Sequence, residues 1–270
     1  MKAAALYLKP TVRPGGADGA SDAPRYAPEW VQASNIGLRV RGVSVRRGDE
    51  REQNGADPSL RRVAATPLQM NREYYDRYAD CFHWRTAGLP RNAAYEPFLR
   101  QLPACARILD AGCGPGRNAA AFLSHGYRVT AIDASPAMVQ IAKRSGIDAR
   151  VMTFQQMTFN EEFDGIWAGA SVLHVPHAEI PDVLERFARA LNPQGILYVS
   201  LKEGQSERIA EDGRFFSYFT LSEFSDSLTG SGLFKVLNAW KRIGPDSSGT
   251  MRMWLNFLAA KSPELSLACQ

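Results

Sequence analysis

A glycine-rich segment at residues 108–118 has the residue types and spacing of a ligand-binding turn. An apolar run ends at Asp110, and Gly112, Gly114 and Gly116 follow at alternate positions. Because alternate glycines leave no side chain between the backbone and a molecule lying over it, the pattern predicts close approach of a ligand. A helix that starts after such a turn offers free amides, so we predict a cofactor site. The alternative is a tight strand-to-helix turn without a ligand.

The spacing of these glycines argues against a dinucleotide cofactor. The dinucleotide fingerprint G-x-G-x-x-G would need a third glycine at position 117, where this chain has Arg117. Asp110, at the start of the pattern, would also repel a pyrophosphate. A carboxylate at this position suits a ligand that carries a positive charge.

A second carboxylate, Asp133, ends the next apolar run, residues 128–132. The two oxygens of one carboxylate can accept hydrogen bonds from both hydroxyls of a cis-diol, which is the chemistry of a ribose ring. The alternative is that Asp133 caps a helix that begins near Pro136.

Together these residues resemble the class I S-adenosylmethionine-dependent methyltransferases, over about residues 95–260. The first motif of that family reads acidic-x-Gly-x-Gly-x-Gly, which this chain matches at Asp110, Gly112, Gly114 and Gly116. Residues 127–136 resemble the second motif, whose carboxylate binds the ribose and falls at Asp133. The resemblance implies that S-adenosylmethionine is the cofactor and that these residues bind it. Within the family, the chain is most similar to bacterial small-molecule members, including the tellurite-resistance-like group.

The third motif departs from the family pattern. The family often has an aspartate after the third strand to accept the adenine amino group, and Thr153 lies where that aspartate would fall. The resemblance therefore implies that the backbone at Phe154 or the amide of Gln155 recognises adenine. Residues 163–175 resemble the strand and loop beside the methionine moiety and the substrate, which implies a cofactor contact at Ala170.

Five further residues are candidates for catalysis or for binding the cofactor's carboxylate. His174 is either a proton acceptor or a hydrogen-bonded wall of the pocket. Tyr75 and Tyr78 belong to an aromatic group that either packs in the core or covers the sulfonium, because an aromatic face attracts a cation. Arg85 and Arg117 could neutralise the carboxylate, although a solvated arginine is the ordinary alternative.

The elements that must position these residues alternate between strands and helices. The expected strands are 107–111, 128–133, 149–154, 163–170 and 195–201, and the expected helices are 118–124, 136–145 and 180–191. Such alternation predicts right-handed crossovers and a mostly parallel sheet with helices on both faces. A helix at 221–229 and strands at 234–240 and 253–260 then predict a C-terminal antiparallel hairpin. The fold class is α/β, the Rossmann-like methyltransferase fold, and residues 203–218 are expected to form a loop that covers the substrate.

The chain divides by composition into four parts. Residues 1–69 show no sustained period of 2 or 3.6, and we predict a disordered leader. It is a solvated extension, an anion-binding arm, or sequence translated ahead of a start at Met70. Residues 70–102 are expected to form an N-terminal helical cap, 103–262 the methyltransferase core, and 263–270 a tail.

Charge and cysteine usage restrict the partners. Residues 1–69 hold 11 Lys and Arg against 7 Asp and Glu, whereas the remainder holds 21 of each. Because residues 70–270 carry no net charge, they lack the excess of basic residues that binding along a nucleic acid backbone needs. No run approaches the roughly 20 apolar residues of a membrane-spanning helix, and the four cysteines show no metal-binding or disulfide spacing. We predict a cytoplasmic monomer or homodimer that acts on a small molecule and needs no metal.

The predicted reaction is in-line transfer of a methyl group from S-adenosylmethionine to a small molecule, driven largely by positioning of the reactants. Three alternatives stay open. One is a cyclase that closes a ring such as azetidine-2-carboxylate from the cofactor itself and releases methylthioadenosine. The others are RNA methylation and a cofactor-binding regulatory subunit without turnover.

Overall fold

The computed structural model describes residues 65–89, 95–230 and 232–263, which lie in one compact unit of the chain, Arg61–Gln270. The predicted disorder of the leader and most of the predicted tail lie outside the described residues. No helix in these three ranges is long and apolar enough to cross a membrane.

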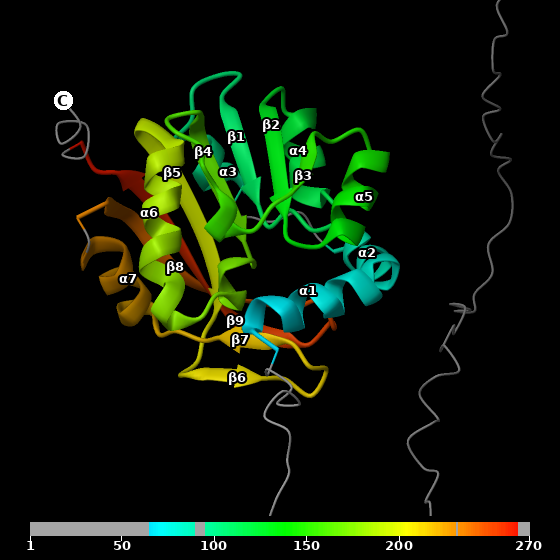
Figure 1. Cartoon of the computed structure of the whole chain (residues 1–270). Helices are drawn as coiled ribbons and strands as arrows, with labels where there is room; N and C mark the ends of the chain where they lie inside the picture. The colour runs from blue at the N-terminus through cyan, green and yellow to red at the C-terminus, as the bar shows by residue number, and fades with distance from the viewer. Residues whose placement is uncertain (1–64, 90–94, 231, 264–270) are drawn as a thin grey trace, which may run out of the picture. The chain divides into compact units, whose positions relative to one another are not determined.

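A seven-stranded sheet in the order β3-β2-β1-β4-β5-β9-β8 lies at the centre (Figure 1). The first five strands of that order pair in parallel, and β9 pairs antiparallel with both β5 and β8. This confirms the predicted parallel sheet with a C-terminal antiparallel hairpin. The strands are β1 (Arg107–Ala111), β2 (Arg128–Asp133), β3 (Ala149–Val151), β4 (Phe163–Gly169), β5 (Leu191–Lys202), β8 (Phe234–Pro245) and β9 (Met251–Lys261).

Helices cover both faces of the sheet, as predicted. On one face, α3 (Tyr95–Leu99), α4 (Arg117–Ser124) and α5 (Pro136–Arg144) pack over the strands, and α6 (Ile180–Ala190) and α7 (Leu221–Gly230) pack over the other. The sequence of α6 shows why this helix forms here. Val183, Leu184 and Phe187 share its buried face, while Glu185 and Arg189 form an ion pair on the exposed face.

Two helices before the sheet form the N-terminal cap, α1 (Pro67–Arg77) and α2 (Ala79–Ala87). Helix α1 begins three residues before the boundary expected at Met70. Thr66 is its N-cap, and the side chains of Thr66 and Gln69 form a capping box, each accepting a hydrogen bond from the other residue's backbone. The first turn of the cap therefore includes residues that the sequence analysis assigned to the leader.

Two segments differ from the expected elements. The expected substrate-covering loop contains a short antiparallel hairpin, β6 (Glu207–Ile209) with β7 (Phe215–Ser217). Strands of three residues are too short to show a period of two, which is why the pattern was missed. The strand expected at 149–154 ends at Val151, and residues Phe154–Gln156 form the 3-10 helix η3, which begins after Thr153.

Candidate active site

A cavity of about 330 Å³ lies at the carboxyl ends of β1, β2 and β4, a size typical of small-molecule sites. It is lined by the glycine-rich turn and by residues that follow β2 and β4. Residues of α1, of β5 and of the hairpin of β8 and β9 also line it. In an open parallel sheet this edge is where ligands bind, because the strand-to-helix loops meet there.

The three glycines of the turn have different surroundings. A Cβ added at Gly112 would lie 2.3 Å from the Cβ of Ser171, and one at Gly116 would lie 2.3 Å from the Cδ1 of Ile147. At Gly114 the nearest neighbour would be the Phe82 ring at 3.9 Å. Gly112 and Gly114 line the cavity, but Gly116 does not. The cofactor contact expected at Gly116 is therefore corrected: this glycine allows the turn to pack against the neighbouring segment.

Asp110 lies behind the turn, which corrects the expectation that it faces a cationic ligand. Its carboxylate is only 1% exposed, and its Oδ2 accepts a hydrogen bond from the backbone N–H of Ala119 at 3.0 Å. Its other oxygen has no partner among the described residues. Burial raises the pKa of this carboxyl to about 7. Asp110 thus ties β1 to the first turn of α4 and does not line the cavity.

Asp133 does line the cavity, at the end of β2. Its two oxygens accept hydrogen bonds from the backbone N–H groups of Gly114 at 2.8 Å and Ser135 at 2.9 Å. Each oxygen keeps a second lone pair for a ligand. Helix α5 is capped by the hydroxyl of Ser135 and not by Asp133. Burial raises the pKa of Asp133 to about 6.

The residues expected to bind adenine also lie at the cavity. Phe154 and Gln155 line it from η3. The ring of Phe154 packs edge-on against Phe187, with 5.4 Å between the ring centroids. The Gln155 side chain donates a hydrogen bond to Glu179 at 2.6 Å, which fixes its orientation. Ala170 lines the cavity after β4 with a φ of 56°.

Arg117 and Arg85, the two expected partners of a carboxylate, differ in position. Arg117 lines the cavity, and its Nη1 donates to the carbonyl oxygen of Thr86 at 3.2 Å. Arg85 is exposed and does not line the cavity. Phe82 and Thr86, which are four residues apart on α2, line the cavity.

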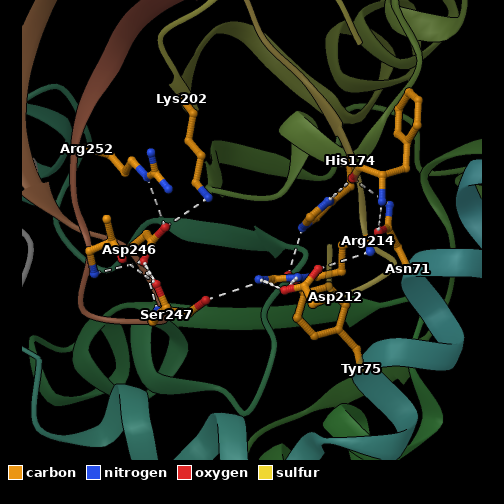
Figure 2. A network of polar contacts seen from close by, with 12 residues as sticks. Asn71, Tyr75, His174, Lys202, Asp212, Arg214, Asp246, Ser247 and Arg252 are labelled. Carbon is orange, nitrogen blue, oxygen red and sulfur yellow. Dashed lines mark hydrogen bonds and ion pairs between the residues drawn. The ribbon is translucent and has the colours of Figure 1, made fainter. Parts of the chain in front are cut away.

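Tyr75 and His174 meet at the cavity, although 99 residues separate them in the chain. The Tyr75 hydroxyl lies 2.8 Å from His174 Nε2, and His174 Nδ1 lies 2.8 Å from the carbonyl oxygen of Phe215 (Figure 2). Burial lowers the pKa of His174 to about 3 and raises that of Tyr75 to about 12. These contacts favour a hydrogen-bonded wall over a proton acceptor at neutral pH.

Tyr78 does not join this pair, which corrects its expected catalytic position. Helix α1 ends at Arg77, and the chain turns at Tyr78 before α2 begins. Tyr78 does not line the cavity. Its ring packs on Tyr74 and is 42% exposed.

Two buried polar residues lie near the cavity: Asn71, which was not predicted, and Arg214, which was expected only as part of the substrate-covering loop 203–218. Asn71 on α1 pairs with the backbone of Phe215, accepting from its N–H at 2.9 Å and donating to its carbonyl oxygen at 3.2 Å. Arg214 contacts the Tyr75 hydroxyl at 3.3 Å and pairs with Asp212. An available signal was that Asn71 precedes Tyr75 by four residues, so both lie on one helix face.

Comparison with known proteins supports the assignment of the core. Residues 108–195 match the family described as methyltransferase domain. The ubiquinone biosynthesis O-methyltransferase of Xanthomonas oryzae is 32% identical over 103 residues, or 35% of this chain and 42% of that protein. The enzyme of the same name from Methylocella silvestris is 34% identical over 125 residues, or 44% of this chain and 46% of that protein. This chain thus spans less than half the length of these curated relatives.

Solved structures share the fold. A methyltransferase from Methanosarcina mazei superposes with a TM-score of 0.58 at 21% identity, covering 62% of this chain and 98% of its own. The [4+2]-cyclase SpnF superposes with a TM-score of 0.57 at 17% identity, covering 74% of this chain and 98% of its own. The resemblance to tellurite-resistance-like members stays a prediction. Residues 108–195 therefore match a methyltransferase domain, and the fold around them is the Rossmann-like fold of class I S-adenosylmethionine-dependent methyltransferases.

Proposed function

We propose that this protein transfers a methyl group from S-adenosylmethionine to an oxygen of a small molecule. The observation that carries the proposal is a single cavity lined by Gly114 and Asp133 and also by the hydrogen-bonded pair Tyr75 and His174. Direct transfer requires that the cofactor site and the acceptor site adjoin. This cavity is lined both by residues suited to the cofactor and by residues that could contact an acceptor. The two O-methyltransferase relatives support oxygen as the acceptor atom.

The residues present fit the cofactor. Gly114 leaves an open space in front of Phe82 that a larger side chain would fill. Asp133 has spare acceptor capacity for a diol, and the 3-10 helix η3 brings Phe154 to the same cavity. When bound, S-adenosylmethionine would supply the sulfonium methyl group, whose carbon would bond to the acceptor oxygen as its bond to sulfur breaks, with the electron pair kept by sulfur and the acceptor's proton released to water.

The chain's own residues contribute positioning and exclusion of water. Asp133, held by two backbone amides, would orient the ribose and so the reacting end of the cofactor. Tyr75 and Phe82 place apolar ring surface over the cavity, which excludes water from the reacting pair. His174 is neutral and already hydrogen-bonded, so we assign it no proton transfer. Fixed orientation of two reactants can by itself supply a large part of a rate enhancement.

Two measurements test the proposal. Calorimetry on the full chain should detect binding of S-adenosylmethionine and none of NAD, since Arg117 stands where a dinucleotide site needs glycine. The protein should then be incubated with S-adenosylmethionine, alone and with a panel of phenols and alcohols, and the products identified. S-adenosylhomocysteine should form only when an acceptor is present. Comparable binding of NAD, or methylthioadenosine formed without an acceptor, would contradict the proposal.

A further inference from the structure

The hydrogen-bonding direction of the Tyr75 hydroxyl is set by its neighbours. The carbonyl oxygen of Phe215 can only accept, so the 2.8 Å contact requires the proton of His174 to be on Nδ1. Burial keeps this imidazole neutral, which leaves a lone pair on Nε2. The Tyr75 hydroxyl, 2.8 Å from Nε2, must therefore donate its hydrogen to His174.

Arg214 occupies one lone pair of the same oxygen. Its Nη1 lies 3.3 Å from the Tyr75 hydroxyl, and a guanidinium can only donate. Arg214 is 8% exposed, and its guanidinium pairs with Asp212 at 2.6 Å. Its cationic carbon lies 4.5 Å from the ring centroid of Tyr74 and 5.0 Å from that of Phe216, which holds the group in place.

One acceptor position of the Tyr75 oxygen is left over. A phenolic oxygen has one donor and two acceptor positions, and His174 and Arg214 use one of each. Tyr75 lines the cavity. We propose that the Tyr75 oxygen accepts a hydrogen bond from the methyl acceptor, so that the site selects molecules carrying a hydroxyl or amino hydrogen near the methylated atom. This inference rests on the proposed function.

The proposal concerns recognition and not proton transfer. Burial keeps Tyr75 protonated at neutral pH, and the positive charges of Arg214 and Lys202 oppose a charged imidazole at His174. A fully deprotonated oxyanion offers no hydrogen to Tyr75. Such acceptors should therefore be discriminated against, as should ethers. Arg214 acts here as a positioning residue, because it contacts Tyr75 and does not line the cavity.

The direction of the hydroxyl can be tested without any ligand. Nitrogen-15 NMR of the imidazole rings in the full chain distinguishes the two neutral tautomers, and a His174→Asn variant assigns the signal among the four histidines. We expect the Nδ1–H tautomer of His174, unchanged between pH 8 and about pH 5, since its pKa lies near 3. The Nε2–H tautomer would overturn the proposal, because Tyr75 would then have to accept from His174.

Acceptor selection can be tested with a matched pair of probes. Calorimetry on protein saturated with S-adenosylhomocysteine should compare p-cresol with 4-methylanisole, which has the same ring but no hydroxyl hydrogen. We expect p-cresol to bind at least about tenfold more tightly. Tyr75→Phe should bring the ratio close to one, whereas Tyr74→Phe, the control on the same helix turn, should keep it.

The outcomes separate the two proposals. If S-adenosylhomocysteine itself does not bind, the proposed function fails, and the tautomer of His174 still tests the direction of the hydroxyl. If it binds but the two probes bind equally to the wild-type protein, the inference about Tyr75 is wrong and the proposed function stands. Persistence of the preference in Tyr75→Phe would likewise overturn the inference. Arg214→Met should reduce the preference, and Arg214→Lys should restore part of it.

Discussion

At Gly114 the requirements of folding and of ligand binding can be separated. Gly112 and Gly116 each face a side-chain atom at 2.3 Å from an added Cβ, so the fold itself excludes larger residues there. Gly114 faces the cavity, and only its φ of +53° and the ligand restrict it. A substitution at Gly114 therefore reports on the cofactor site more cleanly than one at either neighbour.

We predict that Gly114→Ala lowers the affinity for S-adenosylmethionine at least tenfold, about 1.4 kcal/mol, because the new Cβ occupies the space in front of Phe82. Calorimetry gives the affinity and urea unfolding gives the stability. Gly126→Ala is the matched control, since Gly126 also has a positive φ, +85°, with nothing within 4 Å of an added Cβ. Both variants should lose about 1–2 kcal/mol of stability. Wild-type affinity in Gly114→Ala would remove this turn from the site.

The carboxylate of Asp133 makes a second prediction at the scale of one residue. Asp133→Asn should weaken cofactor binding by about 1.5–3 kcal/mol, because hydrogen bonds to a charged acceptor are stronger than those to an amide. The exposed Asp148→Asn removes the same charge near β3 and should leave the affinity unchanged. Equal effects of the two substitutions would assign the loss to net charge alone.

The pKa of Asp133 also predicts a pH dependence. Burial raises this pKa from 3.8 to about 6, so the carboxylate that binds best is present above pH 6 and is neutralised below it. Affinity measured by calorimetry should therefore fall as the pH is lowered from 8 to 5. The decrease should be smaller in Asp133→Asn, which has no proton to gain at this position. A pH dependence identical in both proteins would refute the assignment.

At the scale of elements, α1 is hydrogen-bonded to β7 near one end and to the start of α5 near the other. Asn71 pairs with the backbone of β7, while Asp76 accepts hydrogen bonds from the Ser135 hydroxyl at 2.6 Å and the Ala137 N–H at 3.2 Å, at the start of α5. Tyr75 lies between these two anchors. The position of the Tyr75 hydroxyl therefore depends on both ends of the helix being held.

Loss of the Asn71 anchor should be costly. In Asn71→Ala the buried N–H of Phe215 loses its side-chain partner, while the carbonyl oxygen keeps its hydrogen bond from His174, and we predict a loss of about 1–3 kcal/mol in the free energy of unfolding. Urea unfolding measures this loss. Asn160→Ala, at an exposed asparagine, should change stability by less than about 0.5 kcal/mol. A similar value for both variants would mean that the Asn71 contacts contribute nothing.

The start of α1 gives a prediction that differs from the boundary expected at Met70. Truncation before Met70 removes the capping box formed by Thr66 and Gln69, whereas truncation after residue 64 keeps it. The shorter protein should be less stable by about 1 kcal/mol, as should Thr66→Ala in the full chain. Thr66→Ser retains a capping hydroxyl and serves as the control. If the two truncated proteins unfold at the same urea concentration, α1 does not need this cap.

At the scale of the whole described unit, the cavity is lined by the carboxyl ends of the parallel strands, by the cap and by the C-terminal hairpin. A ligand in it would contact α1, the glycine-rich turn and η3 at once. Hydrogen exchange with and without S-adenosylmethionine should therefore show added protection in α1 and in residues 112–119. Helix α7 does not line the cavity and should change little. Protection confined to α7 would place the ligand elsewhere.

The sequence by itself determined the elements and the type of turn at the site. Strand and helix patterns depend on residues two to four positions apart, so the parallel strands, the helices on both faces and the C-terminal hairpin could all be predicted. The glycine spacing, with Arg117 where a dinucleotide site has its third glycine, predicted a cofactor other than a dinucleotide for the same reason. Local patterns failed where elements were very short, as at β6 and β7, or where a cap extended an element, as at Thr66.

Only the tertiary structure decided which side chains meet at the cavity. Asn71 and the backbone of Phe215 are 144 residues apart, and Tyr75 and His174 are 99 apart. No local pattern encodes such a pair, since it depends on how the cap packs against the hairpin of β6 and β7. Packing also placed Asp110 behind the turn, because its carboxylate bonds to α4. The local sequence determines which residues are able to do chemistry. The distances between these residues depend on how all the elements bury their apolar faces against one another.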